Sequence, residues 1–131
     1  YIMGLDKVII VGQNPSSVEK SGTFRKLNQW TAEWKLNSGY DFMNCSEEYG
    51  QKYTIDYDSL KVTSKYDKVI ALGNVASNSL KKLNIDHFKM PHPSGLNRQL
   101  NDKEFEKTKI KECYNYLYTW ATLLRTNHSR K

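Results

Sequence analysis

Short runs of apolar, often β-branched residues alternate along the chain with segments whose apolar residues recur every three or four positions. Apolar runs of this length are typical of strands buried on both faces, as in a parallel sheet covered by helices. Four such strands are predicted, at residues 7–11, 40–45, 66–72 and 86–90. Helices are predicted at residues 23–36, 55–65, 74–83 and 101–124.

Two of the predicted helices carry their apolar residues on one face. The first has helical spacing of Phe24, Leu27, Trp30 and Trp34. In the last, Asn101 and Glu104 have the spacing of a capping box, and an apolar stripe follows at Ile110, Cys113, Tyr114, Leu117, Ala121 and Leu124. Asn74 is predicted to cap the helix after the third strand, and the polar residues 126–131 are expected to fray.

Alternating strands and helices predict an α/β fold of three layers, α/β/α, with a short, mostly parallel four-stranded central sheet. The 131 residues have the usual size of one domain, so we expect a single compact domain over residues 1–131. Ligands of such folds bind at the carboxyl ends of the strands. Each predicted strand ends in a polar or glycine-bearing segment, so at least three of these segments should meet at one edge: residues 12–15, 44–46, 73–74 and 92–94.

Composition suggests the kind of partner. The net charge of +6 and the pI near 9.2 favour a polyanion such as DNA, bound through its phosphates. A lysine-rich chain from an AT-rich genome would have the same charge without binding nucleic acid. No apolar run approaches the roughly 18 residues of a membrane span, so no membrane partner is expected.

The cysteines and histidines argue against a metal centre. Two cysteines are too few for a disulfide framework, which favours a reduced, cytoplasmic protein. His87 and His92 have the spacing of a zinc-finger histidine pair, but no Cys-x-x-Cys accompanies them. We therefore expect no metal and no cofactor.

Four segments at predicted strand ends resemble motifs of the uracil-DNA glycosylase superfamily. The segment His92-Pro93-Ser94-Gly95-Leu96 resembles the His-Pro-Ser-x-Leu loop of prototype members, and its continuation is similar to the single-strand-selective monofunctional and mismatch-specific members. Gly12-Gln13-Asn14-Pro15 resembles the Gly-x-Asp/Asn-Pro motif, and Leu72-Gly73-Asn74-Val75-Ala76 resembles Leu-Gly-x-x-Ala. Asn44 stands where the family has its base-reading asparagine.

The resemblance implies an enzyme that flips a pyrimidine out of DNA and hydrolyses its N-glycosidic bond. His92 would donate a hydrogen bond to O2 of the leaving base, for which a neutral imidazole suffices. Asn14 would orient the attacking water, but an amide takes no proton, so we expect slower chemistry than with the prototype aspartate. Asn44, with Gln13 also in the substrate site, would read the O4/N3 edge. No lysine stands in a motif position, which predicts a monofunctional enzyme that leaves an abasic site.

The flipped base also needs an aromatic platform, for which we expect Phe24, with Tyr40 or Trp30 as alternatives. Leu96 is the candidate wedge that fills the vacated stack, unless it packs inward as a loop anchor. The remaining DNA contacts are expected from Ser16, Ser94, Gly95 and Arg98.

Three alternatives stay open. The same fold could act on a hypermodified phage-type base in antiviral defence, or could bind DNA without catalysis. An unrelated nucleotide-binding α/β protein is the third, although the chain has neither a Gly-x-Gly-x-x-Gly nor a Walker phosphate loop. The main interpretation is a monomeric DNA glycosylase.

Overall fold

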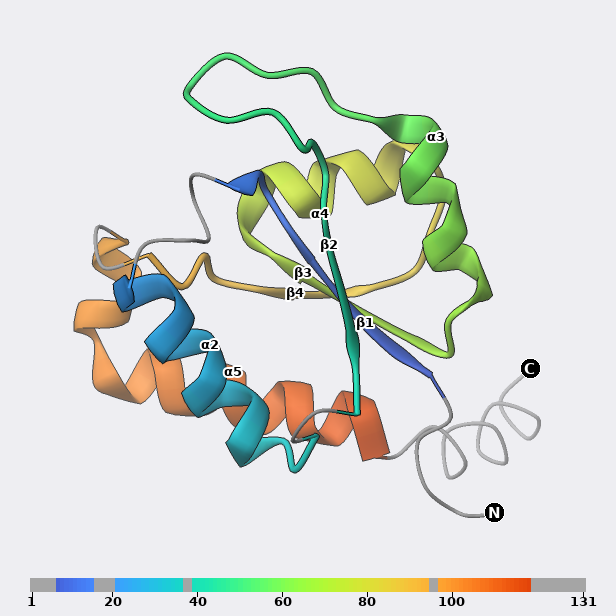
Figure 1. Ribbon diagram of the computed structural model, residues 1–131. Helices are drawn as coiled ribbons and strands as arrows, with labels where there is room; N and C mark the ends of the chain where they lie inside the picture. Colours follow the sequence, from blue (N-terminus) through green and yellow to red (C-terminus); the bar gives the residue numbers. More distant parts are fainter. Residues whose placement is uncertain (1–6, 16–20, 37–38, 95–96, 119–131) are drawn as a thin grey trace.

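The computed structural model describes residues 7–15, 21–36, 39–94 and 97–118 (Figure 1). At its centre lies a sheet of four strands, and every pairing between them is parallel. The strands are β1 (Val8–Gly12), β2 (Asp41–Asn44), β3 (Lys68–Leu72) and β4 (Phe88–Met90), and their order across the sheet is β2-β1-β3-β4. The predicted four-stranded parallel sheet is therefore confirmed.

Helices cover both faces of this sheet, which confirms the three layers (Figure 1). On one face lie α2 (Ser21–Glu33) and α5 (Lys103–Tyr118), and on the other lie α3 (Tyr57–Leu60) and α4 (Gly73–Lys82). Two 3₁₀ helices, η1 (Lys61–Lys65) and η2 (Arg98–Asn101), precede β3 and α5. The part of the chain that the structure describes has no helix long and apolar enough to cross a membrane.

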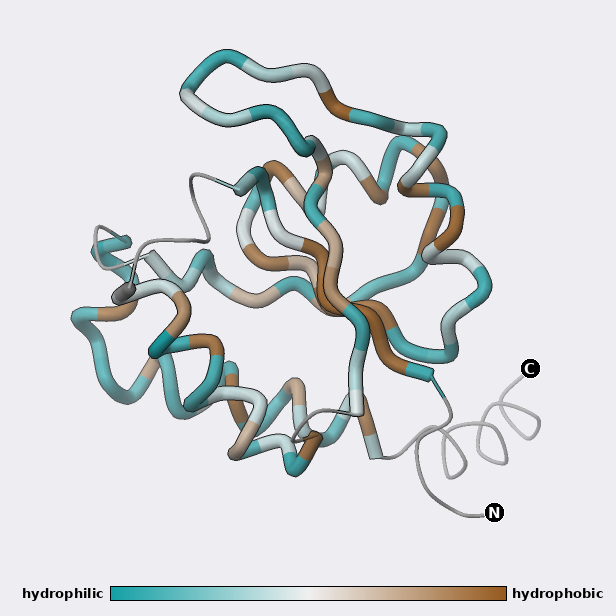
Figure 2. The backbone as a smooth tube through the Cα atoms, viewed as in Figure 1, coloured by the Kyte–Doolittle hydropathy of each residue, from teal (hydrophilic) through white to brown (hydrophobic). Residues whose placement is uncertain are grey.

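The two central strands supply both halves of the core. Alternate side chains point to opposite faces of a strand. Every residue of β1 and β3 is buried, because helices cover both faces of the sheet. Ile10 and Ile70 pack against α2 and α5, whereas Ile9 and Val69 pack against α3 and α4. Figure 2 shows this as a band of hydrophobic residues through the middle of the molecule. Burial of one such side chain stabilises the fold by about 1.5–3 kcal/mol.

The short strand β4 leaves part of β3 without a neighbouring strand, and a side chain takes its place. The ladder between the two strands begins at Ile70 and Phe88. At Val69, the backbone N–H donates to the hydroxyl oxygen of Tyr116 (3.1 Å), and that hydroxyl donates to the carbonyl of Val69 (3.3 Å). Both backbone groups are thus satisfied by α5, which fixes this helix against the sheet.

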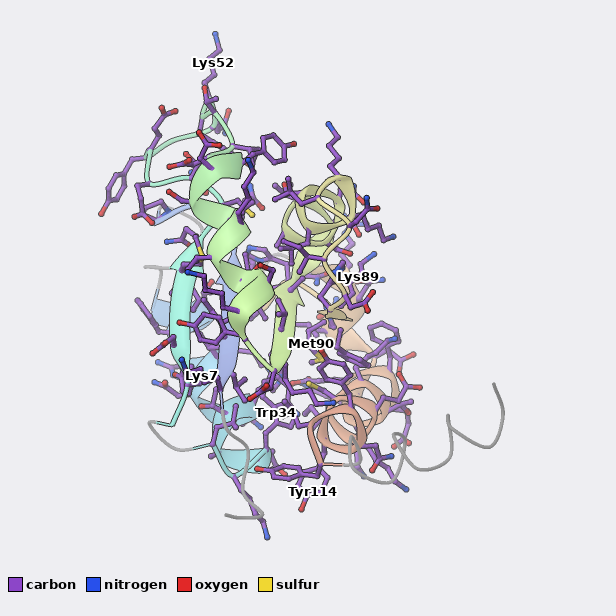
Figure 3. All side chains as sticks on the ribbon, turned by 90° about the vertical axis from the view of Figure 1, so that its right-hand side faces the viewer. Lys7, Trp34, Lys52, Lys89, Met90 and Tyr114 are labelled. Carbon is purple, nitrogen blue, oxygen red and sulfur yellow. The ribbon has the colours of Figure 1, made fainter. Side chains whose placement is uncertain are left out.

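A buried carboxylate joins the two helices of one face. Glu106 of α5 is 5% exposed and accepts hydrogen bonds from Trp30 Nε1 (2.9 Å) and Lys26 Nζ (2.9 Å) of α2. Nearby, Trp34 Nε1 donates to the carbonyl of Ile110 (3.0 Å). Figure 3 shows Trp34 and Met90 in the interior, while Lys52 projects away from the body. The tryptophans therefore supply polar contacts as well as apolar surface.

Two predicted helix caps are wrong. The cap of the long helix lies one residue later than expected, because Asn101 belongs to η2 and Asp102 Oδ1 accepts from the N–H groups of Glu104 and Phe105 (both 3.1 Å). Asn74 is the second residue of α4 rather than its cap, since that helix starts directly at the end of β3 without a side-chain cap.

Other boundaries differ from the predicted ones by a few residues. All four strands begin one or two residues later than predicted, β1 ends one residue later and β2 ends one residue earlier. The segment 55–65 divides into α3 and η1. The predicted tail 126–131, like Ala121 and Leu124 of the apolar stripe, lies outside the described residues.

We predict that Glu106 makes stability depend on acid. Burial raises the pKa of this carboxyl, but the hydrogen bonds from Trp30 and Lys26 lower it by more than burial raises it. The pKa of Glu106 therefore lies below its usual value. A lowered pKa in the folded state stabilises the fold fully above the unfolded value of about 4.3, and this contribution is lost as the pH falls through the folded-state pKa. Glu106→Gln should cost about 1–2 kcal/mol at pH 7, and this cost should shrink below pH 4.3.

Urea denaturation from pH 3 to pH 7 measures this difference. The exposed Glu104→Gln on the same helix is the control and should stay within about 0.5 kcal/mol of the wild type. A difference between wild type and Glu106→Gln that does not change with pH would contradict the role of this carboxylate.

Candidate functional site

The carboxyl ends of all four strands lie along one edge of the sheet (Figure 1). Gly12 pairs with Asn44 at the ends of β1 and β2, and Leu72 pairs with Met90 at the ends of β3 and β4. The segments that follow the four strands are therefore neighbours. This edge carries Asn14, Asn44 and His92, although Asn44 ends one outer strand and His92 follows the other.

His92 follows β4 and is held in one orientation. Its Nδ1 accepts a hydrogen bond from the backbone N–H of Ser94 (3.1 Å), which assigns the proton of the neutral ring to Nε2. Asn97 Nδ2 donates to the carbonyl of His92 (2.8 Å), and the N–H of Asn97 donates to the carbonyl of Ser94 (3.0 Å). The ring can therefore donate a hydrogen bond through Nε2 without being protonated.

Gly73 packs directly against the ring of His92. Its φ is +91°, a conformation that side chains rarely adopt. A Cβ at Gly73 would lie 3.1 Å from Cβ and 3.2 Å from Cδ2 of His92. This contact of Gly73 was not predicted, although a glycine between a strand and a helix was the available signal in the sequence.

Asn14 lies at the end of β1 and is 1% exposed. Its Nδ2 donates to the carbonyls of Glu48 (3.0 Å) and Gly50 (2.9 Å), in the loop after β2. Because both N–H bonds point at these carbonyls, the amide has one orientation, and its Oδ1 acts only as an acceptor. Asn14 therefore anchors a loop, a role that its sequence motif did not indicate.

Asn44, the last residue of β2, has a buried Oδ1 with no hydrogen-bond partner among the described residues. An unsatisfied buried acceptor costs about 1–3 kcal/mol. Such groups are rare in native proteins and call for a reason such as a functional role. Its unsatisfied acceptor therefore makes Asn44 a candidate for binding a ligand that donates an N–H.

Other predicted site residues are less constrained. Gln13 is half-buried and its carbonyl accepts from Ser46 N–H (3.2 Å), which extends the pairing of β1 with β2. Arg98 is exposed at the start of η2, beside the loop of His92 and the half-buried Ser94. The remaining three, Ser16, Gly95 and Leu96, lie outside the described residues.

The candidate aromatic platforms differ in exposure. Phe24, expected either as a platform or as part of the core, is 43% exposed on α2 and does not belong to the core. Trp30 is fully buried and bonded to Glu106, and Tyr40 packs against the core. Burial thus excludes Trp30, and packing against the core argues against Tyr40.

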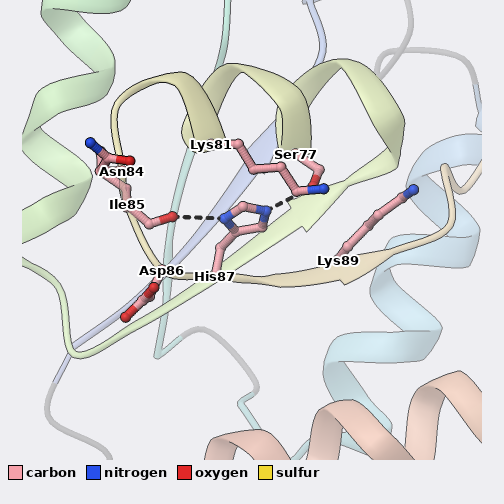
Figure 4. A pocket seen from close by; sticks show the side chains of 7 residues that line it. All are labelled: Ser77, Lys81, Asn84, Ile85, Asp86, His87 and Lys89. Atoms are coloured by element: carbon pink, nitrogen blue, oxygen red, sulfur yellow. Dashed lines mark hydrogen bonds between the residues drawn. The ribbon is translucent and has the colours of Figure 1, made fainter.

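His87 has a different environment from His92 (Figure 4). Its Nδ1 donates to the carbonyl of Ile85 (2.8 Å), so Nε2 accepts from the hydroxyl of Ser77 (2.7 Å). These bonds tie α4 to the segment before β4, beside an open pocket of about 480 Å³ that includes Lys81. Both ring nitrogens are used for structure, as expected from a histidine without motif context.

The described residues offer neither a reactive thiol nor a metal centre. Cys45 and Cys113 are buried and unpaired with each other. Burial raises the pKa of the Cys45 thiol to about 11, despite a hydrogen bond from Ser79 that lowers it. Over the described ranges, no three His, Cys, Asp or Glu side chains gather as metal ligands.

Comparison of this chain with protein-family models, with curated proteins and with solved structures gives no match. A functional proposal for this chain therefore depends on the geometry of the site.

We predict that Gly73→Ala moves the ring of His92. The strained φ alone should cost about 1–3 kcal/mol, and the new Cβ must displace the imidazole. The change should appear in the ¹H–¹⁵N NMR signals of the His92 ring. Gly22→Ala is the control, because Gly22 lies in α2 and a Cβ at this position would meet nothing within 4 Å. Unchanged His92 signals in a folded Gly73→Ala would disprove the contact.

Proposed function

We propose that this chain is a monofunctional DNA glycosylase that excises uracil or a 5-substituted uracil, inside the cell and without metal or cofactor. The observation that carries the proposal is the pattern of donors and acceptors at the sheet edge. His92 offers an Nε2–H donor, and Asn44 offers a buried Oδ1 acceptor beside the donor N–H groups of its amide. Uracil has the complementary edge, with acceptors at O2 and O4 and a donor at N3.

The same groups suit the chemistry of bond cleavage. As the bond from C1′ to N1 breaks, its electron pair moves to the base, and the donor at His92 stabilises the charge that develops on O2. A water held by Oδ1 of Asn14 adds its oxygen to C1′, and its released proton neutralises the departing base. Asn14 orients this water but takes no proton from it, so the departing base must leave with most of its charge formed.

DNA is the substrate that fits the rest of the chain best. The net charge of +6 favours phosphate binding, and Ser94 and Arg98 flank the candidate catalytic histidine. A base inside a duplex must be extruded to reach such an edge, at a cost of a few kcal/mol. Leu96 remains our candidate for the wedge that offsets this cost.

Cleavage of labelled oligonucleotides tests the proposal. The strands carry uracil, 5-hydroxymethyluracil or a bulkier modified pyrimidine, single- and double-stranded, and alkali breaks the abasic sites formed. We expect His92→Ala to slow cleavage of uracil strands by about 10²–10³-fold, as for the loss of an oxyanion donor. At temperatures where it is folded, the control His87→Gln should cleave at the wild-type rate, because His87 contacts α4 and not this edge.

The other outcomes of this assay point to the alternatives. Cleavage of the bulky base alone would favour a defence enzyme for modified phage DNA. DNA binding without an abasic product from any substrate would favour a non-catalytic module.

We predict that the enzyme selects bases by the donor at N3. A site built around a buried acceptor should reject an analogue without the N–H by about 10⁴–10⁵-fold. Uracil and N3-methyluracil, compared as kcat/KM in otherwise identical strands, measure this selection. Asn44→Ala should lose most of the discrimination together with much of the rate. Equal cleavage of both bases would mean that Asn44 does not read this edge.

A further inference from the structure

The loop after β2, residues 45–56, extends beyond the end of the sheet (Figure 1). Hydrogen bonds within the loop and to its neighbours order it. Ser46 begins it in register with the sheet, where its N–H donates to the carbonyl of Gln13 (3.2 Å). The hydroxyl oxygen of Ser46 accepts from the N–H of Glu48 (3.1 Å), and the carboxylate of Glu48 accepts from the N–H of Thr54 (2.9 Å). The hydrogen bond from Ser46 thus joins the loop to the sheet, and the bond between Thr54 and Glu48 joins its two sides.

The side chain of Asn14 holds the part of this loop around Tyr49. Its two N–H bonds reach the carbonyls of Glu48 (3.0 Å) and Gly50 (2.9 Å), the residues on either side of Tyr49. Gly50 has a φ of +94°, and a Cβ there would meet nothing within 4 Å, so its backbone conformation alone calls for glycine. The backbone of Tyr49 is therefore held beside a residue of the candidate active site.

The side chain of Tyr49 is the most exposed large hydrophobic group among the described residues, at 63%. An aromatic ring on an ordered backbone loses little conformational entropy when it binds, because only two side-chain torsions remain. Such rings stack on nucleobases with a contribution of about 1–3 kcal/mol per base. By contrast, the sequence-based candidate Phe24 is less exposed, at 43%, and lies on α2 rather than on this loop.

We propose that Tyr49, rather than Phe24, is the aromatic platform on which the extruded pyrimidine stacks. The proposal deepens the glycosylase function and rests on it for the identity of the base. The chain places Tyr49 five residues after Asn44, so the end of β2 supplies the edge contact and the loop that follows it supplies the face contact. Asn14 then has a second role, because it positions this loop.

Binding of a single-stranded oligonucleotide tests the platform without any need for turnover. The probe carries one 2′-fluoro-2′-deoxyuridine. Its fluorine destabilises the sugar cation and so slows cleavage of the N-glycosidic bond. A matched strand carries a tetrahydrofuran abasic analogue, which has no base to stack. Fluorescence anisotropy gives the dissociation constants for the wild type and for Tyr49→Phe, Tyr49→Ala and Phe24→Ala.

We expect the wild type to prefer the uracil strand over the abasic strand. Tyr49→Ala should weaken binding of the uracil strand by roughly 5- to 150-fold and leave the abasic strand unchanged. Tyr49→Phe should keep the preference, because it keeps the ring, and Phe24→Ala should behave as wild type. Circular dichroism and melting temperature confirm that each variant is folded.

Two results would overturn the proposal: wild-type affinity for the uracil strand in Tyr49→Ala, or a wild type without any preference for the base. Loss of the preference in Phe24→Ala instead would return the role to Phe24. Failure of the proposed function is distinguishable, because a Tyr49-dependent preference without cleavage of any natural strand refutes the glycosylase and leaves the platform in place.

Discussion

Parallel pairing of β1 with both of its neighbours determines where every candidate group lies. Because each strand runs in the same direction, the residues that follow Gly12, Asn44, Leu72 and Met90 all emerge at one edge. Reversal of a single strand would move its polar segment to the opposite end of the sheet. The apolar residues that bury β1 and β3 thus control the site, although none of them needs to touch a substrate.

At this edge, neutral groups are oriented by hydrogen bonds rather than by ion pairs. The backbone of Ser94 selects the tautomer of His92, and Gly73 leaves space for its ring. Charge enters elsewhere, for example at Glu106, which joins α2 to α5 below the sheet. A neutral edge avoids the large cost of burying unpaired charges.

The sequence indicated the features that depend on local pattern. Apolar runs located the strands, the stripe through Cys113 and Leu117 located α5, and the parallel order followed from alternation. Helical spacing alone could not show that Phe24 is exposed while Trp30 is buried, because the buried face of α2 runs through Thr23 and leaves Phe24 beside it. The predicted caps at Asn74 and Asn101 were wrong because α4 starts directly at the end of β3 and because the neighbouring Asp102 caps α5.

Contacts between distant segments were beyond the sequence. Asn14 lies more than thirty residues from the carbonyls that it binds, and no periodicity connects them. This contact limits how the protein could evolve. An aspartate at position 14 would offer a general base, but a carboxylate has no N–H, and it would face two carbonyl oxygens instead of binding them. Under the proposed function, a faster catalyst would therefore arise only after the loop had found a different anchor, so the order in which such substitutions accumulate is constrained.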